Sequence, residues 1–232
     1  MFNTKFCFPD QWTFANYSKL LSDLKKCYTF LSFSDNDSSA KRKIFLRHDI
    51  DVHPNFLDPL LEVETSLDIR SDIYLLNESP LYTIEDMAPK VTDLLSNGFT
   101  VNLHFEYDKN SPDSYEAQHL VQLERFVNVT GHQPKLYTDH KPRGQTHVNV
   151  SCNELINAHS ANVNGPCDYI SDSRGQWNHS NHPLKKSHLM LLTHPIWWNQ
   201  EHVEPLNCLL RASQHHEPHI QQSLLHRLTF RR

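Results

Sequence analysis

Short apolar runs that end in acidic residues or histidine recur along this chain, and they constrain its fold more than any other feature. The first run is residues 44–51, in which an apolar stretch ends at Asp49 and Asp51. Such a stretch predicts a buried strand, and charged groups at its end need a partner or a metal ion. Later runs end in the same way, at His104, Asp172 and His194. Together these strand ends predict one shared metal-dependent site.

Helix-like and strand-like segments alternate, which predicts parallel strands. The expected helices, where apolar residues recur at helical spacing, are residues 10–31, 54–65, 84–96 and 114–129. The expected strands are residues 44–47, 71–76, 99–103, 135–138, 168–171 and 188–193. Because the ends of parallel strands in such an array meet at one face, the separated Asp and His residues are expected to converge there.

Length and charge limit the class of protein. A chain of 232 residues can build one sizeable core, so residues 1–232 are expected to form a single α/β domain. The segment 207–232 is polar but partly amphipathic, and it is a candidate accessory helix. The net charge of -5 gives no electrostatic reason to expect nucleic acid or an anionic membrane as a partner.

The cysteines and the first residues bear on the compartment. The chain has 5 cysteines, an odd number, with no closely spaced pair typical of structural zinc, so free thiols are expected. No leader-like apolar region follows Met1, and no stretch approaches the ~18 apolar residues of a membrane span. The sequence therefore predicts a cytoplasmic protein without a transmembrane segment.

Four motifs, taken in order, resemble the polysaccharide deacetylase superfamily, most closely a divergent branch linked to bacterial surface-polysaccharide biosynthesis. The motifs are RHDID at 47–51, NLHFE at 102–106, SDSRGQW at 171–177 and LTHPIWW at 192–198. The resemblance covers residues 10–200 and implies a distorted parallel (β/α) barrel that binds a divalent metal ion, usually zinc. The implied reaction is hydrolysis of an N-acyl group on an amino sugar.

The resemblance also implies a role for each matching residue. By position, Asp49 is the general base and Asp51 a metal ligand, which suits the acidification of water by a bound metal. His104 matches the first metal-binding histidine, and His194 matches the histidine that protonates the leaving amine. Asp172 is the candidate to orient His194.

One departure leaves the third metal ligand open. The family has a second histidine four residues after the first, where this chain has Asp108. His140 is the slightly preferred replacement, Asp108 is an alternative because zinc accepts carboxylates, and His48 is close enough in sequence to serve. Arg143 is expected to hold the base carboxylate.

Flat aromatic side chains are the candidates for sugar contact. Trp177, Trp197 and Trp198 could line the pocket, although core packing is an equal alternative for Trp197 and Trp198.

The favoured function is a metal-dependent hydrolase that removes an N-acyl group, acetyl in the first instance, from an amino sugar or glycan precursor. That partner could be nucleotide- or lipid-linked. The missing histidine favours a second reading, a non-catalytic carbohydrate-binding relative. A metal-dependent phosphoesterase is the third, although the low glycine count of 5 offers no phosphate-binding loop.

Overall fold

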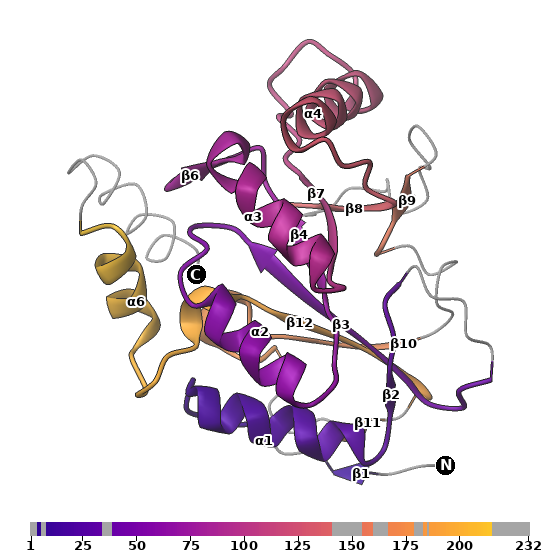
Figure 1. The fold of residues 1–232 in the computed structure, drawn as a ribbon, viewed down its shortest axis with the longest axis vertical. Helices are drawn as coiled ribbons and strands as arrows, with labels where there is room; N and C mark the ends of the chain where they lie inside the picture. The colour runs from indigo at the N-terminus through magenta and orange to yellow at the C-terminus, as the bar shows by residue number, and fades with distance from the viewer. Residues whose placement is uncertain are drawn as a thin grey trace.

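The computed structural model describes residues 4–5, 8–33, 39–140, 155–159, 167–178, 183–184 and 186–214. Its centre is a parallel eight-stranded sheet with the strand order β10-β12-β3-β4-β7-β8-β9, in which β2 pairs with β3 beside this path. The sheet curls into a half-barrel covered by helices (Figure 1). The predicted fold class, a distorted parallel (β/α) barrel, is confirmed.

The strands of this sheet are listed here with their bounds. They are β2 (Thr29–Phe30), β3 (Lys43–Ile50), β4 (Asp72–Leu75), β7 (Thr100–Phe105), β8 (Leu136–Asp139), β9 (Ile156–Asn157), β10 (Cys167–Ser171) and β12 (His188–Thr193). Two small antiparallel pairs lie outside it: β1 (Thr4–Lys5) with β11 (Pro183–Leu184), and β5 (Glu78–Ser79) with β6 (Tyr82–Thr83).

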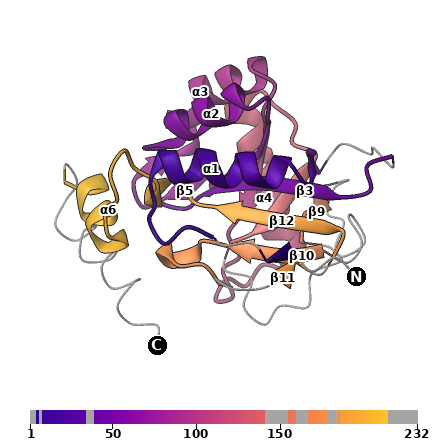
Figure 2. The ribbon, with the colours of Figure 1, turned by 90° about the horizontal axis from the view of Figure 1, so that it is seen from below.

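The helices follow the strands in alternation. They are α1 (Phe14–Lys25), α2 (Leu57–Ser66), α3 (Ile84–Ser96), α4 (Tyr115–Thr130) and α6 (Pro205–Ala212), with short 3-10 helices η1 (Ser173–Gly175) and η2 (Pro195–Trp197). Helices α1, α2 and α3 lie on one side of strands β3 and β12 (Figure 2). Within the described residues, no helix is both long and apolar enough to cross a membrane.

Apolar packing on both faces of the sheet explains why its strands read as apolar runs. Outward side chains such as Leu46 and Leu191 pack with α1 and α6, while Leu75 and Val101 belong to a second cluster with α3 and α4. Inward side chains form a smaller cluster around Phe45. The polar site described below continues this inner face toward the carboxyl ends of the strands.

The barrel is open between the edge strands β9 and β10, which are not paired in the described part of the chain. Side chains bring these edges near each other, because the His159 ring after β9 lies 6.2 Å from the Tyr169 ring of β10. Arg47, from the interior strand β3, approaches His159 at 3.1 Å. In the described part of the chain, the gap between β9 and β10 is therefore bridged by side-chain contacts and not by backbone hydrogen bonds.

The first predicted helix was too long. Thr13 caps α1 by accepting a hydrogen bond from the Asn16 amide, and the helix ends at Lys25. Thr29 and Phe30 leave the predicted helix and pair with β3, where apolar residues are also compatible with a strand. By contrast, the helix predicted at 84–96 is confirmed as α3, with a Thr83 and Asp86 capping box at its start.

The segment 207–232 is described only as far as residue 214. Its first part belongs to α6, whose Cys208, Leu209 and Ala212 are buried in the same cluster as α1. Residues 215–232 lie outside the described chain. Cys27, Cys167 and Cys208, the cysteines that the structure describes, are free thiols as expected.

Candidate functional site

Alternation along β3 directs its acidic residues inward. Arg47, Asp49 and Asp51 follow one another at every second position, so their side chains share one face of the strand. His48 points to the opposite face, where its ring contacts Glu64 of α2. The inward carboxylates therefore stand at the carboxyl end of β3, an interior strand of the sheet, where the neighbouring strands also end.

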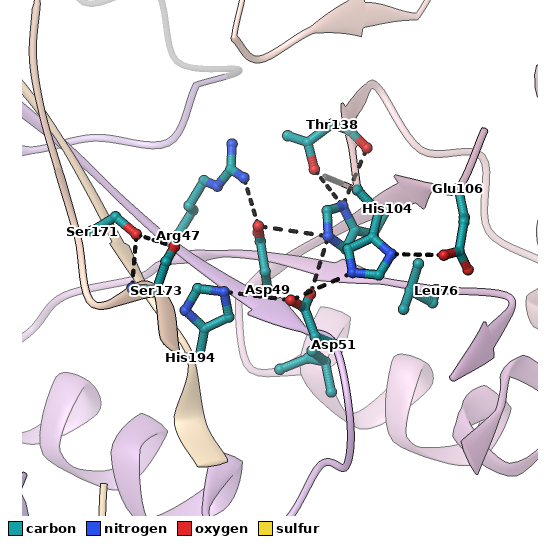
Figure 3. A network of polar contacts seen from close by, with 12 residues as sticks. Arg47, Asp49, Asp51, Leu76, His104, Glu106, Thr138, Ser171, Ser173 and His194 are labelled. Carbon is teal, nitrogen blue, oxygen red and sulfur yellow. Dashed lines mark hydrogen bonds and ion pairs between the residues drawn. The ribbon is translucent and has the colours of Figure 1, made fainter. Parts of the chain in front are cut away.

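Asp51, His104 and His140 come together from the residue after β3, from β7 and from the residue after β8. His104 Nε2 lies 3.1 Å from Asp51 Oδ1, and His140 Nε2 lies 3.6 Å from Asp51 Oδ2. One ligand atom from each residue lies within 4.8 Å of the others. Figure 3 shows the His104 imidazole directed at Asp51. Two imidazole nitrogens and a carboxylate form a donor set suited to zinc and similar ions.

The far side of each imidazole is held by a polar partner. His104 Nδ1 lies 2.8 Å from Thr138 Oγ1, and His140 Nδ1 lies 3.2 Å from Glu106 Oε1. Such contacts on Nδ1 orient a ring and leave Nε2 for a metal ion. Both histidines are therefore oriented as metal ligands are, with Nε2 of each ring left for the ion.

A second histidine and carboxylate pair flanks Asp51 from the other side. His194 Nε2 lies 3.6 Å from Asp51 Oδ2, and His194 Nδ1 lies 2.6 Å from Asp172 Oδ1. The Asp172 carboxylate also accepts hydrogen bonds from the His194 amide and from Trp198 Nε1, each at 3.0 Å. The Asp172 carboxylate thus has all of these hydrogen-bond donors on the outer side of His194. His194 Nε2 faces the interior of the site.

Arg47 forms a buried ion pair with Asp49. Its guanidinium donates to Asp49 Oδ2 at 2.6 Å, and the two side chains are only 1% and 5% exposed. Asp49 Oδ1 is buried without a hydrogen-bond partner. A buried carboxylate oxygen that lacks a donor marks a place for a ligand, a water molecule or an ion. Arg143, predicted to hold this carboxylate, lies outside the described residues.

The charges of the site shift its pKa values in different directions. Burial would raise the pKa of Asp51, but the neighbouring imidazoles, His140 foremost, hold that pKa well below its ordinary range. Burial opposes ionisation of Asp49 too, but Arg47 keeps its pKa below the ordinary value. Burial would lower the pKa of His194, whereas the Asp172 carboxylate raises it to about 9. Both acids are therefore ionised and His194 is protonated near neutral pH.

Two alternative metal ligands lie elsewhere. His48 is fully buried between Glu64 and Thr193, with nitrogen–oxygen distances of 2.6 and 2.8 Å, because even and odd positions of β3 face opposite sides. Asp108 is exposed in the loop after β7, where its carboxylate accepts the Asn110 amide. Neither residue belongs to the metal-ligand groups found in the described part of the chain.

The tryptophans do not form the predicted pocket wall. Trp198 is completely buried, so it cannot stack on a sugar, and Trp197 is only 5% exposed. Trp177 is partly buried; its Nε1 donates to the Pro9 carbonyl, and its ring packs on Trp12. For all three the packing alternative fits better, because this aromatic group covers the outer, α1-facing side of β12 rather than the inner face.

Sequence reasoning did not single out the positions that support the ligands. Glu106 and Thr138 contact the imidazoles, and Arg47 contacts the proposed base, but none was assigned such a role. The signal for Arg47 and Glu106 was present, because each lies two residues from a predicted site residue on the same face of a strand. Thr138 belongs to another strand, and its contact with His104 depends on the β7–β8 register.

Comparison with known proteins gives similarity at the level of structure only. No family model matches the chain, and no curated protein matches it. A peptidoglycan deacetylase, PdaC from Bacillus subtilis, aligns over 85% of this chain and 96% of its own, with a TM-score of 0.47 and 10% identity. A second structure, the Bc1960 peptidoglycan N-acetylglucosamine deacetylase, aligns over 88% and 91%, with a TM-score of 0.44 and 14% identity.

A third match is less complete. The BA3943 protein from Bacillus anthracis, described as a family 4 carbohydrate esterase pseudoenzyme, aligns over 67% of this chain and 58% of its own, with a TM-score of 0.39 and 10% identity.

Proposed function

We propose that this protein is a divalent-metal-dependent hydrolase that removes an N-acyl group, acetyl in the first instance, from an amino sugar or glycan precursor. The observation that carries the proposal is the meeting of two overlapping groups at one strand end: Asp51 with His104 and His140, and Asp51 with Asp49 and His194. The first group supplies metal ligands, and the second places an acid and a base beside them.

The residues present fit a divalent ion such as zinc. His104 and His140 would bind it through Nε2, and Asp51 through a carboxylate oxygen. The low pKa of Asp51 keeps that carboxylate available as a ligand at neutral pH. A divalent ion in such a site polarises a carbonyl oxygen and lowers the pKa of water toward neutrality. Native metal identity stays a prediction.

Asp49 is the proposed general base. Arg47 occupies its Oδ2, which leaves the unpartnered Oδ1 to accept a proton from an attacking water molecule. The ion pair also keeps the carboxylate ionised and fixes its orientation. Arg47 thereby holds the base carboxylate, while the role expected for Arg143, which lies outside the described residues, stays a prediction.

His194 is the proposed general acid. With the pKa raised to about 9 by Asp172, its ring carries a proton at neutral pH. Asp172 binds Nδ1, so the proton delivered to the departing amine comes from Nε2, on the side that faces Asp51. A residue that gives a proton and a residue that takes one thus both lie beside the proposed ligand Asp51.

The contacts of His140 support the hydrolase over the non-catalytic carbohydrate-binding alternative. That alternative rested on the aspartate at position 108, which leaves the family's second histidine missing. His140 offers an imidazole in its place, held by Glu106 and 5% exposed. The described residues give no specific support to a phosphoesterase. The link to polysaccharide biosynthesis, the single domain and the cytoplasmic location stay predictions.

Elemental analysis of the purified protein, combined with an acetate-release assay on N-acetylated amino sugars, tests the proposal. Wild type is expected to bind about one divalent ion, and Asp51→Ala, His104→Ala and His140→Ala to lose both metal and hydrolysis. Asp108→Ala is the matched control for metal binding and should keep the ion, because Asp108 lies outside the ligand group. A wild-type protein that binds no metal after addition of zinc would contradict the proposal.

A further inference from the structure

A cleft of about 500 Å³ lies beside the proposed metal site. Its wall is formed by residues that follow β4 and β7 and by one face of α4. Glu106 belongs to both places, because it lines the cleft and its carboxylate contacts His140. Figure 3 shows Leu76, another lining residue, on the same side of the site as Glu106. A molecule in the cleft would therefore be adjacent to the reacting group.

The cleft is rich in negative charge. Glu78, Glu106 and Asp108 line it, and Arg125 is the positively charged residue among the lining side chains. The Arg125 guanidinium is already paired, with Glu78 at 2.6 Å and with Glu85 at 3.0 Å. The positive charge of Arg125 thus compensates the carboxylates that it contacts. The lining as a whole therefore favours a positively charged ligand over a negatively charged one.

Asn77 gives an independent indication that a ligand binds here. It lines the cleft, is only 5% exposed, and its Oδ1 has no hydrogen-bond partner. Its Nδ2 donates to the Gln122 carbonyl at 2.7 Å, which determines the orientation of the amide, since a flipped amide would oppose two acceptors. A buried acceptor without a donor is unfavourable, and a ligand N–H or O–H would satisfy it.

We propose that this cleft binds the sugar next to the acylated one, and that it selects a neighbour carrying a free ammonium group. This inference rests on the proposed function. Tyr107 and Val121 provide apolar surface for the C–H face of a sugar ring, while the carboxylates and Asn77 Oδ1 provide acceptors. An amino sugar that has already lost its acyl group matches both the donors and the charge that this lining requires.

Binding can be measured by calorimetry with two tetrasaccharides of the same linkage, one built of glucosamine and one of glucose. At mildly acidic pH and low salt, the glucosamine tetramer is expected to bind wild type about tenfold more tightly. In Glu78→Gln/Asp108→Asn the preference should fall to about threefold or less, since two carboxylates of the cleft lose their charge. Glu62→Gln on α2 is the matched control, because this exposed acid does not line the cleft.

Equal binding of the two tetramers, absence of binding by both, or a preference unaffected by the double variant would overturn the inference. His104→Ala separates it from the proposed function, because His104 does not line the cleft. Suppose that wild type holds no metal and hydrolyses no N-acyl sugar, but that wild type and His104→Ala both bind the glucosamine tetramer more tightly than the glucose tetramer. Only the proposed function then fails. If wild type hydrolyses N-acyl sugars without any charge preference, only the cleft assignment fails.

Discussion

Replacing Arg47 by methionine removes the cation that compensates a carboxylate buried in the barrel. Asp49 Oδ2 accepts a 2.6 Å hydrogen bond from Arg47, and the Asp49 side chain is 5% exposed. Removing one member of a buried ion pair typically costs about 3–5 kcal/mol, because the remaining charge is left without a partner. A domain of ordinary stability has about 5–15 kcal/mol in total. Arg47→Met should therefore fold, with a much lower free energy of unfolding.

The loss should depend on pH in a defined direction. In wild type, Asp49 has a folded-state pKa below 3.8, so its contribution to stability is present above that pH and is lost as the pH falls. Without Arg47, burial raises the folded-state pKa above the unfolded value, so the folded variant takes up a proton more readily. The difference between wild type and variant should thus be largest near neutral pH and shrink as the pH approaches 4.

Urea unfolding in the presence of a chelator measures the effect without a contribution from metal. Arg47→Met/Asp49→Asn is the matched control, because it removes both charges and should recover most of the lost stability. A loss below about 1 kcal/mol at neutral pH, or one that does not change between neutral and acidic pH, would refute the reasoning. The same result would remove Arg47 from the positioning role assigned to it.

Further predictions concern the acid, a buried histidine and the metal. Asp172→Asn should move the alkaline limit of the hydrolysis pH profile down from about 9, because His194 loses the charge that raises its pKa; an unchanged limit would exclude this pairing. Burial lowers the pKa of His119 to about 4, so wild-type stability should fall as the pH drops from 6.5, and His119→Leu should flatten that fall by about 2 kcal/mol in urea titrations. Zinc at about a hundredfold above its Kd should add about 3 kcal/mol to the free energy of unfolding, whereas His140→Ala should show no such increase.

Much of the fold could be predicted because its strands are buried on both faces. The segments around Leu46 and Leu191 are continuous apolar runs, the pattern that parallel strands covered by helices favour. The short strands β2 and β9 were missed, since two-residue ladders carry almost no sequence period. Thr29 and Phe30 show the difficulty, because they follow a helical pattern directly and become a strand only by pairing with β3.

The candidate site was predictable where chemistry follows the strand ends and unpredictable where it depends on packing. Asp51 and His104 were expected as ligands, with His140 as the slightly preferred candidate for the third, and these three residues are found together. For Trp198 the sequence left sugar contact and core packing equally open, and its buried indole N–H supports Asp172 from the helix-facing side. A sequence shows that a tryptophan is near a catalytic motif, but the direction of its ring is decided by the packing of α1 against η2 and β12.

The register of β7 and β8 explains how His140 can stand in for a ligand that the chain lacks at position 108. These strands are parallel, with His104 opposite Thr138, and the His140 amide continues the ladder by donating to Phe105 at 2.7 Å. One inward position further along, Glu106 and His140 are therefore neighbours, and their contact follows from the pairing that places Thr138 on His104. The same ladder thus orients both imidazoles, so a ligand from the adjacent strand needs no rearrangement of the loop that carries Asp108.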